Sequence, residues 1–332
     1  MTGKFQKFNL STPISSLSLS IKGSWLKEQV DNLYDDLEKA GLTRFKPLIY
    51  LGDEWFSPDG IAAISIPFYL AHPSLRALEL QKIGEVEGGV SITCMKLLRH
   101  EAGHCFDHLF GISKKRHFFK LFGNPNSTYN PEKQKGKPYS RNYVKHIDAT
   151  YSQTHPCEDF AESFAVVITP GNDWRKKYKN LPNIKRKLDW VERQIKLHRN
   201  ACTRKIPKKA PSFFNQKNLN YSIGKFYKSR INELGPFYLG SHDKILRSLF
   251  SKEYPSNIGA HKYISKNQDL ILKNLSQQND YFKWENRQVL KELQQRAFQL
   301  GLKHSEGRNP QIFKKIAHCV TQTLDARNSM IE

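Results

Sequence analysis

The sequence predicts an α+β fold that is followed by a basic, mainly helical C-terminal region. Two short apolar runs support the strands: LIYL at 48–51 and IAAISIPFYL at 61–70. Both are too short for typical helices, and Pro67 predicts that the second is an edge strand of a small mixed sheet. Apolar residues at helical spacing fill much of the remaining chain, so helices should dominate.

Four helices are predicted in the first 202 residues, from apolar residues at intervals of three and four. They cover residues 25–40, 92–110, 156–168 and 183–199. Gly41 and Gly111 follow the first two helices as C-terminal cap signals, and Thr154 precedes Pro156 as a candidate N-cap. Residues 111–150 hold the basic run SKKRHFFK and many turn formers, which predicts a loop-rich insertion.

The C-terminal region differs from the rest in charge. Residues 203–332 carry 23 Lys and Arg against 10 Asp and Glu, and 203–220 reads as a linker. Helical patterning then recurs at 242–251, 267–277, 283–301 and 310–326. We therefore predict two domains, residues 1–202 and residues 203–332.

The charge of the whole chain, +22, favours acidic partners: nucleic acid, an anionic membrane face or an acidic protein substrate. A solvated surface without such a partner is the alternative. Aromatic residues are interleaved with the C-terminal lysines, at Phe213, Phe214, Tyr221, Phe226, Tyr227, Tyr263, Tyr281, Phe282 and Trp284. They could stack on single-stranded nucleic acid, line an exosite for an acidic substrate, or simply form a core under exposed lysines.

The five cysteines, Cys94, Cys105, Cys157, Cys202 and Cys319, include no CxxC pair. An odd number spread over a long chain predicts reduced thiols rather than a disulfide framework. The N-terminus shows no apolar secretory segment, and no run reaches the roughly 18 apolar residues of a membrane span. The expected location is cytoplasmic, although export without a signal would leave no trace.

The motif with the clearest chemistry is His100-Glu101-Ala102-Gly103-His104. Residues four apart lie about 40° apart around a helix, so both imidazoles can reach one ion at about 2.0–2.1 Å. Glu101 follows the first histidine and can act as a general base toward a metal-bound water and then as an acid toward the leaving amine. Chance matches to this pattern occur in ordinary helices, which is the competing interpretation.

A catalytic zinc needs a third protein ligand. A metzincin would have glycine at 107 and histidine at 110, where this chain has Asp107 and Phe110. His108 follows on the same helix, but three successive turns of one straight helix cannot surround one tetrahedral ion. The remaining candidates are Glu158 and Glu162, of which one could bind the metal and the other accept the free N–H of a ligand histidine. A pair of solvated acids is the alternative.

HEAGH followed by an ExxxE helix resembles the gluzincins, the class of zinc peptidases with HExxH and a glutamate ligand. More narrowly, HEAGHCFDH with HPCEDFAESFA is similar to the bacterial family called putative zinc-binding metallopeptidases. The stretch YSQT, the EDFAESF segment and Asp107 are also similar to the catalytic core of anthrax lethal factor. The resemblance covers about residues 60–200 and implies a zincin-like core.

The resemblance implies a role for each matching residue. Glu158 would be the third ligand, beside His100 and His104, and Glu162 would be the partner of a ligand histidine, which we expect to be His100. Tyr151, seven residues before Glu158, would donate its hydroxyl to the oxyanion of the tetrahedral intermediate. An ordinary packing tyrosine is the alternative for that position. Zincins also add a peptide substrate to an edge strand, for which residues 60–69 are the candidate, with a plain core strand as the alternative.

Together these features predict a zinc metallopeptidase with one Zn²⁺ per chain. It would hydrolyse a peptide or protein substrate by zinc-activated water, with Glu101 as general base and acid. The alternatives are a catalytically inactive zincin-like scaffold and a nucleic-acid-binding protein that uses the basic C-terminal region.

Overall fold

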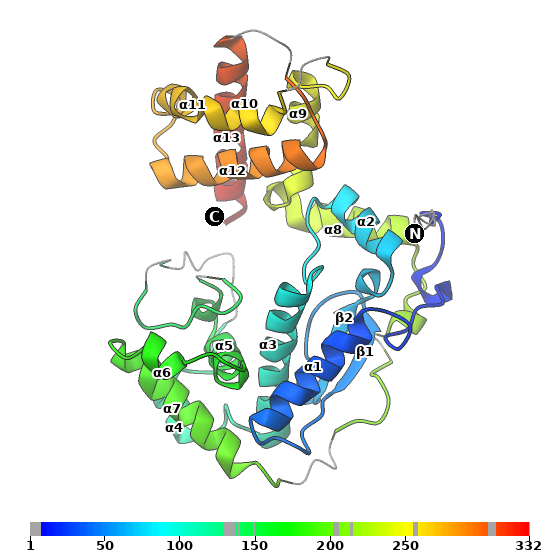
Figure 1. Ribbon diagram of the computed structural model, residues 1–332, viewed down its shortest axis with the longest axis vertical. Helices are drawn as coiled ribbons and strands as arrows, with labels where there is room; N and C mark the ends of the chain where they lie inside the picture. The colour runs from blue at the N-terminus through cyan, green and yellow to red at the C-terminus, as the bar shows by residue number, and fades with distance from the viewer. Residues whose placement is uncertain are drawn as a thin grey trace. The chain divides into compact units, whose positions relative to one another are not determined.

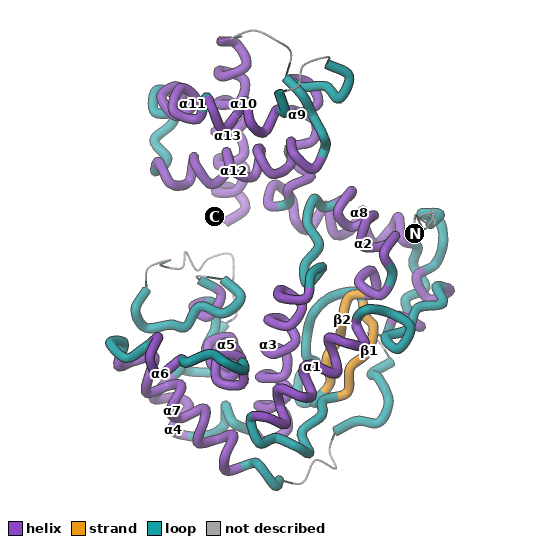
Figure 2. The backbone as a smooth tube through the Cα atoms, in the orientation of Figure 1, coloured by secondary structure: helices purple, strands orange, loops and turns teal. Residues whose placement is uncertain are grey.

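The computed structural model describes residues 8–128, 137, 140–148, 150–201, 206–212, 215–254, 258–304 and 310–331. It is a mixed, mostly helical protein with one small parallel sheet (Figures 1 and 2). The chain divides into two compact units. Unit 1 comprises residues 1–76 and 87–224, and unit 2 comprises residues 77–86 and 225–332.

The sheet of unit 1 consists of β1 (Leu48–Gly52) and β2 (Ala63–Pro67), which lie where the two strands were predicted. They run parallel, with Leu48 opposite Ala63. Among the described residues the expected mixed sheet is therefore a two-stranded parallel sheet, with one isolated antiparallel bridge from Phe56 to Ser65. All five residues of β2 are buried, and the chain leaves the strand at Pro67 in a short 3-10 helix rather than continuing to residue 70.

The four helices predicted for this part of the chain are confirmed. They are α1 (Leu26–Lys39), α3 (Ser91–Phe110), α5 (Pro156–Ile168) and α7 (Pro182–Leu197). Gly111 ends α3 in the left-handed conformation, with φ of 60°, as expected of a glycine cap. The N-cap of α5 is His155 rather than Thr154, because the His155 imidazole accepts the backbone N–H of Cys157 at 3.2 Å.

Three further helices of the N-terminal part were not predicted: α2 (Pro73–Lys82), α4 (Arg116–Leu121) and α6 (Trp174–Lys177). The helix α4 lies inside the stretch interpreted as a loop-rich insertion. Phe118 anchors it, since this side chain is fully buried against Phe122 and Phe160. The rest of that insertion is described only in part, because residues 129–136, 138–139 and 149 lie outside the described residues.

Unit 2 is mostly helical, and one apolar core lies between its helices from residue 243 onward. Its helices are α8 (Ile223–Leu234), α9 (Asp243–Leu249), α10 (Ala260–Lys266), α11 (Gln268–Leu275), α12 (Lys283–Gln299) and α13 (Pro310–Ile331). The interleaved aromatic residues differ in their burial. Phe226, Tyr227 and Tyr263 are buried, Phe282 and Trp284 are exposed, and Tyr221 and Tyr281 are partly exposed. Phe213 and Phe214 lie outside the described residues.

The end of the predicted linker belongs to unit 1. The backbone N–H groups of Ile14 and Ser15 donate to the carbonyls of Tyr221 and Leu219, at 3.0 and 2.9 Å. Gln216 is buried beside the same N-terminal segment. This part of the chain is therefore packed against the N-terminal segment, while the division into domains 1–202 and 203–332 stays a prediction.

Four of the cysteines, Cys94, Cys105, Cys157 and Cys319, are free thiols. Cys202 lies outside the described residues. Within the described part of the chain, every helix is too short or too polar to cross a membrane.

Candidate metal centre

The candidate site forms where α3 crosses α5, the two helices that carry the predicted motifs (Figure 1). Gly103 makes this crossing close. A Cβ at this position would lie only 2.8 Å from the Cα of Ala161 and 3.1 Å from its carbonyl oxygen. The glycine inside HEAGH is therefore needed for packing, because a larger residue would push apart the two helices that bear the histidines and the acids.

Three polar atoms converge at this crossing. The Nε2 atoms of His100 and His104 are 3.0 Å apart. Glu158 Oε2 lies 3.0 Å from the first nitrogen and 3.2 Å from the second. Ligand atoms bound to a tetrahedral zinc at about 2.0–2.1 Å lie about 3.3 Å from one another. The triangle observed here is close to one face of that tetrahedron, and among the described residues these three alone form such a group.

Glu162 orients the first histidine from the opposite side. Its Oε1 lies 3.0 Å from His100 Nδ1, and its Oε2 accepts the backbone N–H groups of His146 and Ile147 at 3.2 and 2.9 Å. Glu162 is fully buried, so these contacts are not shared with solvent. When His100 Nδ1 donates to Glu162, the lone pair of Nε2 is left for a metal, as is usual for histidine ligands.

The charges around the site favour a cation. Burial alone would lower the pKa of His100, but hydrogen bonds to Glu158 and Glu162 and the nearby charge of Glu101 raise it to about 10. Burial would likewise raise the pKa of Glu158, yet the charge of His104 and the hydrogen bonds from both histidines lower it below its usual range. Carboxylates that hold a proton on an imidazole this strongly would equally stabilise a metal cation, so the donor set and its charge fit zinc.

Glu101 follows His100 in α3 and is buried beside the triangle. It is 6% exposed, and burial raises the pKa of its carboxyl group. Its Oε2 is buried and has no hydrogen-bond partner among the described residues. A carboxylate with raised proton affinity and a vacant acceptor atom is suited to take up a proton from a reacting group.

The remaining candidates lie near the triangle without joining it. The ring of Tyr151 lies edge-on to that of His100, with centroids 5.3 Å apart. His108 is the next turn of α3, and its ring stacks at 6.4 Å from that of His104. Its Nδ1 faces the hydroxyl of Ser57 at 3.4 Å. Among the described residues, the group of ligand atoms that converge therefore does not include His108, as expected.

Sequence reasoning missed the segment at 146–147, which clamps Glu162. No local signal pointed to it, because the contribution comes from backbone N–H groups that every residue except proline carries. Which backbone groups reach Glu162 depends on the path of the chain before α5, and the sequence does not reveal that path.

Two helices, α3 and α5, bring two imidazoles and a carboxylate to one point, which is the ligand set of zinc-dependent hydrolases. Residues 88–193 match the model of the family described as "Putative zinc-binding metallo-peptidase". The matched stretch contains all six predicted site residues. No curated protein and no solved structure matches the chain, so the resemblance to anthrax lethal factor stays a prediction from the motif residues.

Proposed function

We propose that this protein is a zinc metallopeptidase of the gluzincin type, which holds one Zn²⁺ through His100, His104 and Glu158. The observation that supports this most directly is the triangle of ligand atoms, with sides of 3.0–3.2 Å. Glu158 is 54 positions after His104 in the sequence, so local spacing along one helix does not explain why these three ligand atoms lie together. The site is also accessible, because His104 and Glu158 are 16% and 13% exposed.

Bound zinc would supply a water with a pKa lowered toward about 7 and would polarise the substrate carbonyl. The chain's residues then have separate tasks. Glu101 accepts a proton at its carboxylate and delivers it to the leaving nitrogen, which its raised pKa favours. Glu162 fixes the ring of His100. Tyr151 donates its hydroxyl to the oxyanion that develops on the substrate carbonyl.

The proposed substrate is a peptide or protein, which the basic surface would favour in acidic form. An existing contact of β2 restricts where a peptide strand could pair with residues 60–69. Ser65 pairs with Tyr50 in β1 and also with Phe56, so both sides of β2 are occupied at this position. A substrate strand would have to pair beside this bridge or displace it. Nucleic acid as a partner of the C-terminal region stays a prediction.

The deciding experiment measures metal content and peptide cleavage in the same samples. Glu101→Gln should keep about one zinc per chain and lose cleavage, because it retains the shape of the side chain but not its basicity. Glu158→Ala should lower zinc affinity sharply, because it removes a ligand. Glu162→Ala should weaken zinc binding by about 10- to 100-fold, the effect expected of a residue that orients a ligand.

Three results would contradict the proposal. A wild-type protein without stoichiometric zinc would remove its basis. Undiminished cleavage by Glu101→Gln would exclude the assigned proton carrier. Loss of zinc from Glu162→Ala with full retention by Glu158→Ala would reverse the assignment of the two acids.

A further inference from the structure

Lys187 of α7 is a buried cation outside the group of metal ligands. It is 7% exposed, although lysine is seldom buried unless it is paired. Its ammonium group donates to Asp159 Oδ2 of α5 at 2.5 Å and to the backbone carbonyl of Asn142 at 3.0 Å. It also lies over the ring of Tyr143, 4.4 Å from the ring centroid. One side chain therefore joins α5 and α7 to the segment that precedes α5.

The same segment carries the two backbone donors of Glu162. From Asn142 the chain passes through Val144, whose side chain is fully buried, to His146 and Ile147. The N–H groups of these last two residues donate to Glu162 Oε2 at 3.2 and 2.9 Å. Only a few residues thus separate the carbonyl that Lys187 binds from the donors that hold Glu162.

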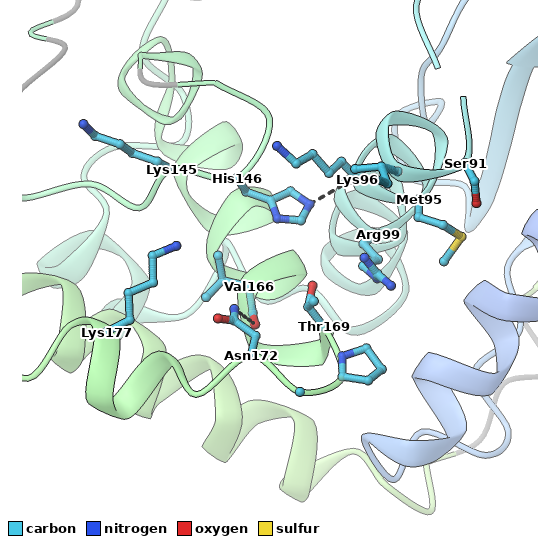
Figure 3. A pocket seen from close by; sticks show the side chains of 13 residues that line it. Ser91, Met95, Lys96, Arg99, Lys145, His146, Val166, Thr169, Asn172 and Lys177 are labelled. Carbon is cyan, nitrogen blue, oxygen red and sulfur yellow. Dashed lines mark hydrogen bonds between the residues drawn. The ribbon is translucent and has the colours of Figure 1, made fainter. Parts of the chain in front are cut away.

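Other contacts hold the far end of the segment. The ring Nε2 of His146 lies 3.1 Å from the carbonyl oxygen of Lys96 in α3 (Figure 3). The hydroxyl of Ser152 donates to the carbonyl of Val144 at 2.9 Å. Lys187 anchors the near end, where its ammonium group binds the main chain itself.

Stability alone does not require a charged pair at this place. Replacement of a buried ion pair by apolar residues of similar volume is often neutral or stabilising. An apolar side chain at position 187 could fill the same space, but it could not donate to the carbonyl of Asn142. The ammonium group therefore has a use beyond its pairing with Asp159, and that use is to hold the segment.

We propose that Lys187 is a positioning residue of the metal centre. It holds residues 142–147 in the path that directs two backbone N–H groups at Glu162, and Glu162 in turn orients the ring of His100. Lys187 acts through this segment and not by contact with the metal. The inference rests on the proposed function, because it concerns the same zinc site.

The test compares the zinc affinity of variants of the full chain, measured by competition with a chelator. Lys187→Met/Asp159→Leu removes both charges together, so that neither is left buried without a partner. We expect its zinc affinity to fall about tenfold, the lower end of the effect of a residue that orients a ligand. Asp159→Asn keeps an oxygen acceptor for Lys187 and leaves the bond to Asn142 in place. Its zinc affinity should stay within twofold of the wild-type value.

Ile195→Ala is the control for a general loss of stability. Ile195 is 2% exposed on the same helix, and truncation of a buried isoleucine lowers stability by leaving a cavity. Its zinc affinity should stay within twofold at a temperature where every variant is folded. Hydrogen exchange of the backbone N–H groups at 146–147, followed by NMR on metal-free protein, is the second measurement. Exchange should be about fivefold faster in Lys187→Met/Asp159→Leu than in Ile195→Ala.

Unchanged zinc affinity in the double variant would overturn the inference. Equal losses in the double variant and Ile195→Ala would assign the effect to stability, and an equal loss in Asp159→Asn would assign it to the charge beside Glu158. Either result would overturn it as well. A wild-type protein without zinc would instead contradict the proposed function. The exchange rates then decide alone, because equal rates at 146–147 in the double variant and in Ile195→Ala would exclude the role of Lys187.

Discussion

At the scale of single residues, the buried side chain of Glu162 holds the ring of His100 and the backbone at 146–147 together. Its two oxygens receive three donors, one from the ring of His100 and two from the backbone at 146–147. The sequence predicted the contact with His100, through the ExxxE spacing and the family resemblance. The backbone donors could not be foreseen, because they depend on the path of a loop rather than on a residue type.

Tyr151→Phe should lower kcat for peptide cleavage by about 100- to 1,000-fold, because it removes one oxyanion donor and keeps the ring that packs edge-on to His100. Zinc content and KM should change little. The measurement is steady-state kinetics beside metal analysis. A kcat within threefold of the wild-type value would show that Tyr151 is an ordinary packing residue.

His146 gives a prediction for the pH dependence of folding. Burial lowers the pKa of this imidazole to about 4, although the charge of Glu162 opposes the shift. Between about pH 6.5 and pH 4 the unfolded chain binds a proton that the folded chain does not, so stability falls as the pH falls. A pKa shift of this size changes the free energy of unfolding by about 3 kcal/mol across the whole pH range.

His146→Gln keeps a side-chain N–H for the carbonyl of Lys96 and cannot titrate. Its free energy of unfolding should therefore fall less than that of the wild type as the pH is lowered. The free energy of unfolding of metal-free protein is measured by urea titration at several pH values from 4 to 7. The control is His117→Gln, at an exposed position of α4, which should leave the slope of the wild-type curve unchanged. An unaltered slope in His146→Gln would refute the assignment.

At the scale of elements, the crossing of α3 and α5 is the contact on which the site depends. Gly103→Ala would place a methyl group 2.8 Å from the Cα of Ala161, and backbone atoms cannot rotate away. We expect a loss of about 1–3 kcal/mol in stability and weaker zinc binding, because the helices must separate. Ile92→Ala, at an exposed position of α3, is the control for both thermal unfolding and zinc affinity. Equal zinc affinity in the two variants would contradict the role assigned to the crossing.

Helices were predicted well where a long apolar stripe was present and poorly where it was not. The long helix α3 was located within one residue at its start, and its glycine cap was identified. Short helices such as α4 and α6 were missed, because a few residues contain too little periodicity and their stability comes from single anchors such as Phe118 and Trp174. The cap of α5 was misplaced by one residue, since Thr154 uses its hydroxyl on the carbonyl of Tyr151 instead.

At the scale of the whole molecule, unit 2 draws together segments that are far apart in the sequence. Arg296 is 2% exposed and donates to the carbonyls of Leu80 and Gln81, at 3.0 and 2.9 Å. It also donates from Nε and Nη2 to the two carboxylate oxygens of Asp243, at 2.6 and 3.1 Å. One guanidinium thus joins residues more than 200 positions apart, which explains why 77–86 belongs to unit 2.

Arg296→Met should destabilise unit 2 by about 3–5 kcal/mol, because it leaves a partly buried carboxylate and two carbonyls without their donor. The measurement is the midpoint of urea unfolding, followed by circular dichroism. Arg247→Met is the control, since Arg247 is 53% exposed and lies 4.0 Å from the same Asp243, and it should change stability by less than about 0.5 kcal/mol. Equal midpoints would show that the buried arginine contributes little.

The sequence by itself determined the helices of the site, the pair of histidines and the neighbouring glutamate, because these depend on spacing along one helix. It also narrowed the proposed third ligand to two acids on another helix, of which the family resemblance favoured Glu158. Only the tertiary structure shows that Glu158 meets the two imidazoles while Glu162 lies behind one of them. The choice depends on how α5 rotates and crosses α3, and that geometry is set by the contact between Gly103 and Ala161, 58 positions apart in a sequence whose local pattern does not record it.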